Sequence, residues 1–419
     1  MDISRRTFIS AAAMAAAMPL TADAAKKKGR PVRHAIIGCG GQGMNHLEGF
    51  LAVGGCTIAA VCDVDPMRLG KAGERAPEAK RYTDFRELLE NRRIDSVSVV
   101  TPDHWHTPVA LAALQAGKHV YVEKPCSHNI AEGFALERAA AKTGLCVQHG
   151  TQSRTSPGVM DAIKFEHDGG IGTVRAAKAI NHQFRGPIGR APETAPPAGV
   201  NYDLWLGPAP LRPFTENRWH YNWHWHWDYG CGDMGNDGIH QVDIARWGLG
   251  VTWPKSVTAS GGQLFYDDDH ETPDTQMVVF EYEKCHLIYE MRLWTDYPME
   301  GHDNGVIFYG DKGTVEVGRK GCFVKLIGEE PRRLGDGIVW GPNLRRFLAA
   351  AGADDTGMLT APPSEAVPSA ALCHLGNIAT RVGRRLHFDS ATMSCPNDTE
   401  ANALFARSYR AGYELPEIG

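Results

Sequence analysis

The hydrophobic positions of residues 33–150 fall into short apolar runs separated by amphipathic segments. The apolar runs are rich in β-branched residues and predict strands at 33–38, 56–62, 96–100, 118–122 and 145–148. The segments between them predict helices at 44–53, 108–116 and 130–143. Regular alternation of strand and helix is typical of a doubly wound parallel sheet. We therefore expect an α/β domain over 33–150.

The later chain changes its pattern. Four runs that are apolar or alternate with polar residues predict strands at 276–282, 286–294, 305–310 and 313–317. Gly, Asp and Pro separate these runs, as in an antiparallel sheet, and residues 189–200 read as a proline-rich surface loop. Two closing helices are predicted at 369–384 and 399–410, and the first places His374 and Asn377 on one face, for packing or for the active site. Residues 151–419 are therefore expected to form a second, α+β domain.

The first residues indicate an export signal. Arg5 and Arg6 precede an apolar stretch, residues 9–20, that is too short to span a bilayer. A small-residue cleavage pattern follows at 22–24. We expect a removable twin-arginine signal over 1–24, a linker over 25–32, and a periplasmic or otherwise exported protein without membrane contact after cleavage. That route carries folded proteins, so a cofactor would be loaded beforehand and held tightly.

Charge and cysteine content narrow the class of protein. The chain has 44 Lys and Arg against 49 Asp and Glu, and its basic residues are dispersed, so nucleic acid is not an expected partner. Its ten cysteines are scattered without a CxxC pair, and several lie in predicted buried strands. Such cysteines behave as small hydrophobic residues, and we expect free thiols.

A glycine-rich turn follows the first predicted strand. Gly38, Gly40 and Gly43 fit G-x-G-x-x-G between a strand and a helix, and Asp63 ends the next strand twenty residues after Gly43. Glycines at these positions let the backbone approach a pyrophosphate, and the carboxylate binds a ribose diol. Because a carboxylate repels a 2′-phosphate, NAD is favoured over NADP. The alternative is a helix-packing turn beside a surface aspartate.

Two further strand ends carry polar motifs. "TPDHWH" at 101–106 and "EKP" at 123–125 follow predicted parallel strands, and ligands bind at that edge of such a sheet. Trp105 is a further pocket candidate beside the cofactor. The candidate cofactor-binding residues outside the glycine turn are Asp63, Thr101, His106, Glu123 and Lys124.

These motifs resemble a known family. "TPDHWHTPVALAALQAGKHVYVEKP" at 101–125, "VQHGTQSR" at 147–154 and "GCGDMGNDGIHQVD" at 230–243 are similar to the signatures of the glucose–fructose oxidoreductase, inositol dehydrogenase and rhizopine-catabolism (Gfo/Idh/MocA) family. The resemblance implies an N-terminal Rossmann domain and a C-terminal domain with a large, open, mainly antiparallel sheet. It also implies NAD(P)-linked redox chemistry on sugars, inositols or related polyols, and a homo-oligomer formed through the C-terminal sheet.

The resemblance also assigns the two catalytic candidates. Lys124 matches the family lysine that lies beside the nicotinamide and bonds the reacting hydroxyl, and His240 matches the catalytic histidine. The sequence departs from the family at Asn236, where many relatives carry aspartate; a carboxylate there would raise the pKa of His240. Asp237 would point about a quarter-turn away on a helix. Lys124 and His240 are therefore expected to share the acid–base work, unless His240 is only structural.

Between these motifs lies an unusual aromatic segment, residues 217–230, with four of the ten tryptophans and three histidines. It predicts either a carbohydrate platform or a tryptophan-packed loop. His224 and His226 would share a face if the segment were a strand, but no supporting Cys or Glu cluster indicates a metal, and none is predicted. The candidate substrate-binding residues are Arg154, Trp223, His224, His226, Asn236, Asp237 and His240, with Gln152 as a further pocket residue.

Three functions are compatible with the sequence. The first is an oxidoreductase that acts on a sugar, glycoside or polyol hydroxyl with a tightly bound NAD. The second is an NAD-dependent glycoside-cleaving enzyme that works through a transient keto-sugar without net redox change, as in some members of the family. The third is a non-catalytic sugar-binding protein, against which Lys124 and His240 argue.

Overall fold

We describe the chain from a computed structural model, which covers residues 30–417. The predicted twin-arginine signal, 1–24, and most of the linker, 25–32, lie outside these residues. Within the part that the structure describes, no helix combines the length and the apolar character that a membrane crossing requires.

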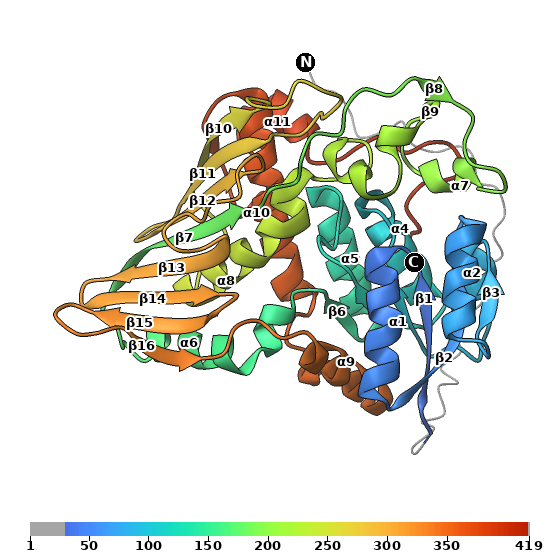
Figure 1. Ribbon diagram of the computed structural model, residues 1–419, viewed down its shortest axis with the longest axis horizontal. Coiled ribbons are helices and arrows are strands. Elements are labelled where there is room, and N and C mark those ends of the chain that lie inside the picture. Colours follow the sequence, from blue (N-terminus) through green and yellow to red (C-terminus); the bar gives the residue numbers. More distant parts are fainter. Residues whose placement is uncertain (1–29, 418–419) are drawn as a thin grey trace. The chain divides into compact units, whose positions relative to one another are not determined.

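Residues 32–149 form a six-stranded sheet in the order β3-β2-β1-β4-β5-β6, with every pair parallel. Its strands are β1 (Val32–Ile37), β2 (Cys56–Cys62), β3 (Lys80–Tyr82), β4 (Ser96–Val99), β5 (His119–Val122) and β6 (Val147–His149). The intervening helices are α1 (Gly41–Val53), α2 (Pro66–Arg75), α3 (Phe85–Leu89), α4 (Asp103–Gln115) and α5 (Ile130–Thr143). This is the predicted doubly wound Rossmann sheet (Figure 1).

Helices cover both faces of this sheet because its strands are apolar on both sides. Side chains of α1 and α2 pack with the later helix α9 (Gly341–Ala353) in one buried cluster, and those of α3, α4 and α5 belong to the cluster on the other face. Local signals fix the helix ends. Asp65 accepts a hydrogen bond from the Met67 amide at the start of α2, and Gly144 ends α5 in a left-handed conformation.

The second sheet has nine strands in the order β16-β15-β14-β13-β7-β12-β11-β10-β17. Only β7 and β12 pair in parallel, so the sheet is mainly antiparallel, as the resemblance implies. Its strands are β7 (Val174–His182), β10 (Ser256–Gly262), β11 (Thr275–Glu281), β12 (His286–Arg292), β13 (Asn304–Gly310), β14 (Gly313–Gly318), β15 (Gly321–Leu326), β16 (Arg332–Gly335) and β17 (Leu386–His387).

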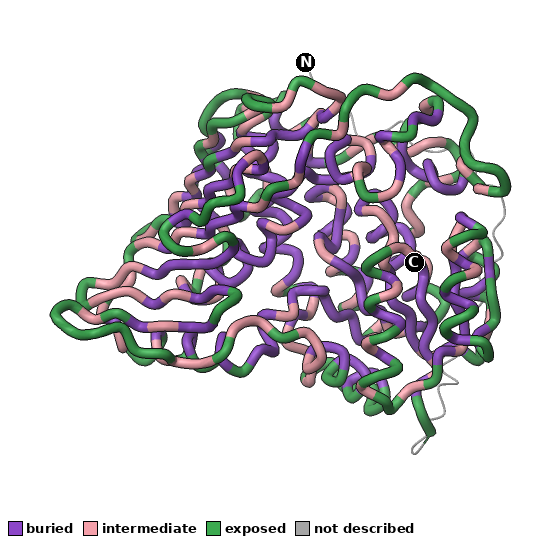
Figure 2. The backbone as a smooth tube through the Cα atoms, viewed as in Figure 1, coloured by how far each residue is buried: buried purple, intermediate pink, exposed green. Residues whose placement is uncertain are grey.

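One face of the nine-stranded sheet is covered by helices. The helices α6 (Pro157–His167), α8 (Ile239–Leu249) and α10 (Pro363–Val382) contact its strands, and α10 also contacts α5, which covers the six-stranded sheet. Burial alternates along β11, which identifies a second face that is not covered by these helices (Figure 2). The remaining short elements are β8 (Glu193–Thr194), β9 (Phe214–Thr215), α7 (Tyr202–Leu206) and α11 (Thr399–Ala403).

Several predicted elements differ from those observed. Helix α4 begins at Asp103 rather than at 108, because Pro102 and Pro108 are both accommodated near its start. The predicted closing helix at 399–410 ends at Ala403, and residues 407–413 instead run across other segments. Strands β7, β10, β15 and β16 were not predicted, because their exposed faces weaken the apolar pattern.

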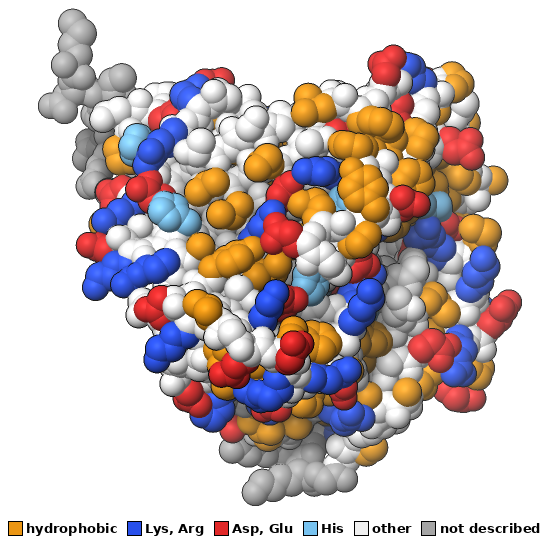
Figure 3. Space-filling view, turned by 60° about the vertical axis from the view of Figure 1, so that its left-hand side comes forward, with side chains coloured by type: hydrophobic (Ala, Val, Ile, Leu, Met, Phe, Trp, Pro, Cys, Tyr) orange, Lys and Arg blue, Asp and Glu red, His pale blue; other side chains and the backbone are white. Residues whose placement is uncertain are grey.

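The surface carries mixed charge. On the face drawn in Figure 3, Lys and Arg side chains are interspersed with Asp and Glu, and this face presents no continuous basic surface. All ten cysteines are free, and burial raises the pKa of thiols such as Cys56 to about 11 and Cys146 to about 12.

Candidate active site

A cavity of about 610 Å³ lies beyond the carboxyl ends of the parallel strands. Its wall includes the glycine turn, the ends of β2, β4 and β5, the aromatic segment and the start of α8. The predicted site residues that line it are Gly38, Gly40, Asp63, Thr101, His106, Glu123, Lys124, Trp223, His224, Asn236 and His240, together with Trp105 and Gln152. The fold thus brings together in one cavity motifs that are up to two hundred residues apart.

The glycine turn has no room for side chains. Gly38 has φ +93°, and a Cβ there would lie 2.4 Å from the Val100 carbonyl oxygen. A Cβ at Gly43 would lie 1.9 Å from the carbonyl oxygen of Gly38. The N-cap of α1 is Gly40, and neither a capping side chain nor an acidic residue occupies the first turn. Free amides at the N-terminus of a thirteen-residue helix fit the pyrophosphate of a dinucleotide.

Asp63 occupies the position expected of a ribose ligand. Its carboxylate accepts hydrogen bonds from the backbone amides of Cys39, at 2.7 Å, and Asp65, at 2.9 Å, while burial raises its pKa. Arg68, which sequence reasoning missed, lines the cavity beside it and lies 3.7 Å from the Asp65 carboxylate. The signal available was its position in the first turn of the helix that follows Asp63. These groups fit the ribose end of NAD.

The "TPDHWH" and "EKP" motifs are tied together by His106. The His106 Nδ1 and Nε2 atoms lie 2.6 Å and 2.8 Å from the carbonyl oxygens of Pro125 and Thr101. Burial lowers the pKa of His106 to about 4, so at pH 7 the neutral ring has one N–H and donates to one of these two carbonyl oxygens. Thr101 Oγ1 is buried without a partner, which leaves one hydroxyl free to bind a ligand. Glu123 accepts a 2.8 Å hydrogen bond from His46 and therefore supports the wall.

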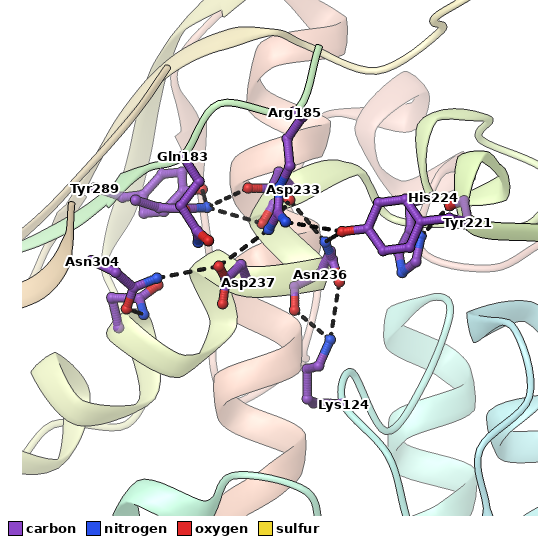
Figure 4. Close-up of polar contacts among 12 residues, drawn as sticks. Lys124, Gln183, Arg185, Tyr221, His224, Asp233, Asn236, Asp237, Tyr289 and Asn304 are labelled. Atoms are coloured by element: carbon purple, nitrogen blue, oxygen red, sulfur yellow. Dashed lines mark hydrogen bonds and ion pairs between the residues drawn. The ribbon is translucent and has the colours of Figure 1, made fainter. Parts of the chain in front are cut away.

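Lys124 points across the cavity to the segment before α8. Its Nζ atom donates to the backbone oxygen of Asn236, at 2.5 Å, and to Asn236 Oδ1, at 3.1 Å (Figure 4). The Lys124–Pro125 bond is cis. Asn236 belongs to a π-helical turn, η4 (Met234–Gly238), which continues directly into α8. The wider turn lets both Asn236 and His240 face the cavity.

His240 is buried and has a free nitrogen. Its Nδ1 atom has no hydrogen-bond partner, and burial together with the Lys124 ammonium lowers its pKa. The Asn236 side chain has no hydrogen bond to His240, and bonds instead with Lys124, Asp233 and Tyr221. His240 therefore lines the cavity, has a pKa below the ordinary histidine value, and is not oriented by Asn236.

Three predicted substrate residues do not line the cavity. Arg154 is buried and donates to both oxygens of Asp243, at 2.8 Å and 2.9 Å, so its guanidinium serves an internal ion pair. His226 is buried, with Nδ1 3.6 Å from Glu271. Asp237 accepts hydrogen bonds from Arg185 and Asn304, each at 3.2 Å, on the far side of η4. Residue type and motif position did not reveal these partners.

His374 and Asn377 also lie away from the cavity. Both are buried on α10, where His374 Nε2 lies 3.1 Å from the Ser127 carbonyl oxygen and Asn377 donates to that of Cys231. Their role is the packing alternative that the sequence left open. Asp103, in contrast, lines the cavity and accepts a 3.1 Å hydrogen bond from the Cys231 amide. Burial raises the pKa of Asp103 to about 7, although the Lys124 ammonium opposes this.

Some side chains of the aromatic segment line the cavity, and others pack in the core. It folds as a 3₁₀ helix, η3 (His220–Trp225), rather than as a strand. Trp219, His220, Tyr221, Trp223 and His224 line the cavity, while Trp225 is fully buried. Among the described residues, no group of three or more His, Cys, Asp or Glu side chains is arranged to hold a metal ion.

Residues 199–229, which we call the covering segment, also contact the nucleotide end of the cavity. The Asn201 amide donates to the Val64 carbonyl oxygen at 3.2 Å, and His220 Nε2 lies 3.3 Å from Asp65 Oδ2. Val64 packs against the aromatic cluster that includes Trp205. The turn between β2 and α2, which carries Asp63, is therefore held by the covering segment.

The covering segment is in turn held by residues 407–413. Arg410 donates to the Gly207 carbonyl oxygen at 2.8 Å and also bonds Asp203. The Tyr413 hydroxyl donates to Asp203 at 2.7 Å. Trp105 Nε1 adds a 3.1 Å bond to the Leu204 carbonyl oxygen from inside the cavity. These contacts fix the covering segment over the site.

Comparisons with known proteins agree with this architecture. The profile described as "Oxidoreductase family, NAD-binding Rossmann fold" matches residues 32–151. The companion profile, "Oxidoreductase family, C-terminal alpha/beta domain", matches residues 175–292.

Curated relatives match part of the chain. A "Glycosyl hydrolase family 109 protein" of Saccharopolyspora erythraea is 38% identical over 165 residues, which cover 37% of this chain and 36% of that protein. An "Alpha-N-acetylgalactosaminidase" of Shewanella oneidensis is 34% identical over 121 residues, which cover 27% of this chain and 26% of that protein. The matched region thus spans about a third of these relatives' length or less.

Solved structures match the fold over most of the chain. The WlbA dehydrogenase from Bordetella pertussis, in complex with NADH and UDP-GlcNAcA, has a TM-score of 0.66 at 21% identity and covers 86% of this chain and 99% of its own. The aldose-aldose oxidoreductase from Caulobacter crescentus, complexed with glycerol, has a TM-score of 0.67 at 21% identity, with 86% and 100% coverage. At these identities the likeness establishes the fold.

Proposed function

Because the chain belongs to the Gfo/Idh/MocA oxidoreductase family, we propose that it is an NAD-dependent oxidoreductase acting on a hydroxyl of a sugar, glycoside or polyol. One observation carries the proposal. A single cavity is lined by Gly38 and Asp63 at one end and by Lys124 and His240 at the other. Bound NAD would supply the hydride acceptor, held by the glycine turn, the α1 amides and Asp63.

The chain's own residues supply the proton chemistry. Two hydrogens of the Lys124 ammonium are directed to Asn236 oxygens, which leaves the third for the substrate hydroxyl oxygen. That donor stabilises negative charge developing on the oxygen as the carbonyl forms. His240, which lines the cavity and has a lowered pKa, accepts the hydroxyl proton. Both residues lie in the same cavity wall, as one proton transfer requires.

Aromatic side chains of the covering segment fit a carbohydrate. Trp219, Tyr221 and Trp223 line the cavity and offer flat faces to sugar C–H groups. His224 adds a polar group in the same wall. The solved relatives with this fold were crystallised with a sugar nucleotide, glycerol or levoglucosan.

A panel assay without added NAD tests the proposal. Purified protein is incubated with free sugars, polyols and glycosides, and the products are separated by chromatography. Formation of paired oxidised and reduced sugars supports the oxidoreductase. No change in any compound, with NAD bound to the protein, would favour the non-catalytic sugar-binding protein instead.

A second candidate is redox-neutral glycoside cleavage. The curated relatives named as glycosyl hydrolase family 109 proteins and as an alpha-N-acetylgalactosaminidase favour it. In this reaction a transient keto-sugar makes the neighbouring C–H acidic, the aglycone is eliminated, water adds, and the sugar is restored. In the same panel, aglycone release without accumulation of an oxidised sugar would identify this reaction.

Export of the folded holoprotein by the twin-arginine route is part of the proposal. It rests on Arg5, Arg6 and the apolar residues 9–20. Replacing both arginines with lysine should retain the protein in the cytoplasm, and fractionation followed by immunoblotting measures this. Unchanged export of the double variant would rule the route out.

We also propose a homo-oligomer formed through the open face of the nine-stranded sheet. The side chain of Met277 on β11 is 50% exposed there, although neighbouring positions in that strand are buried. A large sheet face with apolar side chains is suited to a symmetric interface. Light scattering of Met277→Glu, which should lower the mass relative to wild type, tests the interface.

A further inference from the structure

The Asn236 side chain bridges a lysine and a buried carboxylate. Its Oδ1 accepts from Lys124 Nζ at 3.1 Å, and its Nδ2 donates to Asp233 Oδ1 at 2.9 Å (Figure 4). The two ends of one amide therefore face groups of opposite charge. Asp233 does not line the cavity, and it reaches Lys124 only through this amide.

Asp233 is a buried hydrogen-bond acceptor. Burial raises the pKa of its carboxyl, while Arg185, Asn236 and Asn181 favour the ionised form. Only 1% of its surface is exposed, and its carboxylate accepts from Asn181 Nδ2 at 2.8 Å. Arg185 Nη2 lies 3.1 Å from the same oxygen that accepts from Asn236. Every one of these neighbours presents an N–H group to the carboxylate. An ionised carboxylate can only accept, so the bond from Asn236 has one allowed direction.

This arrangement determines which way the amide faces. If the Asn236 amide were reversed, its oxygen would face the Asp233 carboxylate and its NH₂ group would face the Lys124 ammonium. Both contacts would be repulsive in a site with little water to screen them. Asp233 therefore sets the orientation of the oxygen that holds Lys124.

The same carboxylate supports a second part of the cavity wall. Arg185 bonds Asp233 and also donates to the Tyr221 hydroxyl at 2.9 Å. Tyr221 lines the cavity and lies within 3.5 Å of Asn236 Nδ2. One buried negative charge thus organises both the lysine and an aromatic residue of the wall.

We propose that Asp233 is a positioning residue, which acts through Asn236 to hold the Lys124 ammonium in the direction of the substrate hydroxyl. The inference rests on the proposed function, in which Lys124 bonds that hydroxyl. The proposal further requires that one of the two side chains at positions 233 and 236, and not both or neither, carries a negative charge. Two charges would repel each other across 2.9 Å, and none would leave the amide free to turn.

A double-mutant cycle tests this requirement. Asp233→Asn should lower kcat about tenfold or more, because the amide of Asn236 loses its fixed direction. Asn236→Asp should lower kcat as well, because two carboxylates then adjoin. The exchange Asp233→Asn/Asn236→Asp restores one charge and should return kcat to within about threefold of wild type.

Rescue by the exchange distinguishes positioning from a structural role. If Asp233 were needed only for packing or for holding Arg185, the kcat of the exchange variant would be no higher than that of the less active single variant. That result, or an unchanged kcat in Asp233→Asn, would overturn the proposal.

A second measurement does not depend on turnover. The side-chain NH₂ signals of Asn236, identified by their disappearance in Asn236→Asp, should exchange slowly with solvent in the NAD-bound wild-type protein. Asp233→Ala should make them exchange at least about tenfold faster. Unchanged exchange in Asp233→Ala would also overturn the proposal. A third outcome separates the two proposals. If the Asn236 signals exchange fast in Asp233→Ala but the wild-type protein turns over no sugar, the proposed function is rejected, and Asp233 still fixes the orientation of the Asn236 amide.

Asp274→Ala is the matched control for loss of a buried carboxylate. Asp274 is fully buried and accepts from the backbone amides of Phe265, at 2.8 Å, and Tyr266, at 2.9 Å, outside the cavity. Its removal should lower the melting temperature but leave the Asn236 signals and kcat at wild-type values. An equal effect of both variants on the Asn236 signals would show general loosening and overturn the proposal.

Discussion

His220 Nε2 lies 3.3 Å from Asp65 Oδ2, so a residue of the covering segment is paired with the turn that follows Asp63. The two residues are 155 positions apart in the sequence, and both line the cavity. Asp65 also donates its backbone amide to the Asp63 carboxylate, so the contact adjoins the residue that would hold the ribose. The contact gives a physical basis for slow exchange of the cofactor.

We predict that NAD(H) co-purifies with the protein and that His220→Ala releases it several-fold faster. The alanine removes the pairing with Asp65 but leaves the backbone bond from Asn201 to Val64. Acid extraction and chromatography measure the bound nucleotide, and fluorescence of NADH follows its release. His167→Ala, at an exposed position outside the cavity, is the control. Nucleotide-free protein that needs millimolar-level NAD for full activity would contradict the prediction.

We predict that Lys124→Ala abolishes turnover and leaves NAD bound. The substitution removes the donor to the substrate hydroxyl, and loss of one acid–base group lowers the rate by about a hundredfold to ten-thousandfold. The glycine turn and Asp63 are unchanged, so extraction should recover as much nucleotide as from wild type. Turnover close to that of the wild type would remove Lys124 from the mechanism.

His240→Ala should abolish turnover together with the acidic limb of the pH–rate profile. Burial and the Lys124 ammonium lower the pKa of His240, so in the wild type this limb should lie below the ordinary histidine value of 6.5. Activity falls when the imidazole is protonated, because it then cannot accept the hydroxyl proton. Full activity in His240→Ala with an unchanged profile would show that the histidine is structural.

The folded protein should lose stability in mild acid. Burial lowers the pKa of eleven histidines in residues 30–417, among them His34, His104 and His149, to about 3, and His106, His220 and His374, to about 4. Below pH 6.5 the unfolded chain binds protons at these positions and the folded chain does not. Each histidine therefore lowers the free energy of unfolding by up to about 1.4 kcal/mol per pH unit between 6.5 and its folded pKa.

Buried carboxyls act in the opposite direction. Burial raises the pKa of Asp103 and Glu166 to about 7, and it also raises the pKa of Asp63, Glu137, Asp228 and Asp233. In the folded state these groups take up protons before their unfolded counterparts and offset part of the loss. Eleven histidines outweigh these six carboxyls, and the melting temperature should fall steadily from pH 7 to pH 5. Scanning calorimetry in matched ionic strength measures it, and a flat or rising melting temperature would contradict the expectation.

Local patterns were sufficient for much of the fold. Strand Cys56–Cys62 and helix Ile130–Thr143 have the predicted bounds, because their apolar spacing, caps and flanking glycine are all local in sequence. The glycine turn was recognisable for the same reason, since strand, glycines and helix are contiguous. The parallel sheet follows once such units repeat.

Partners that are distant in sequence could not be predicted. Arg154 has the type and position of a pocket residue, but Asp243 lies 89 positions later and takes up its guanidinium. The contact of Lys124 with Asn236 spans 112 positions, and the orientation of that amide depends on Asp233, which lies in the motif at 230–243 but was not a predicted site residue. The roles of the aromatic residues could not be predicted either. Trp223 lines the cavity, whereas Trp225, two positions later, is buried in the core.

The bond from Arg410 to the Gly207 carbonyl oxygen joins residues 203 positions apart and sets an order of events during synthesis. The parallel strands and the glycine turn are synthesised within the first 150 or so residues, and domains generally begin to fold from that end. Helix α9, which packs with α1 and α2, follows later, and residues 407–413, which hold the covering segment, come later still. The contacts that fix the covering segment over the site are therefore among the last that the growing chain can form.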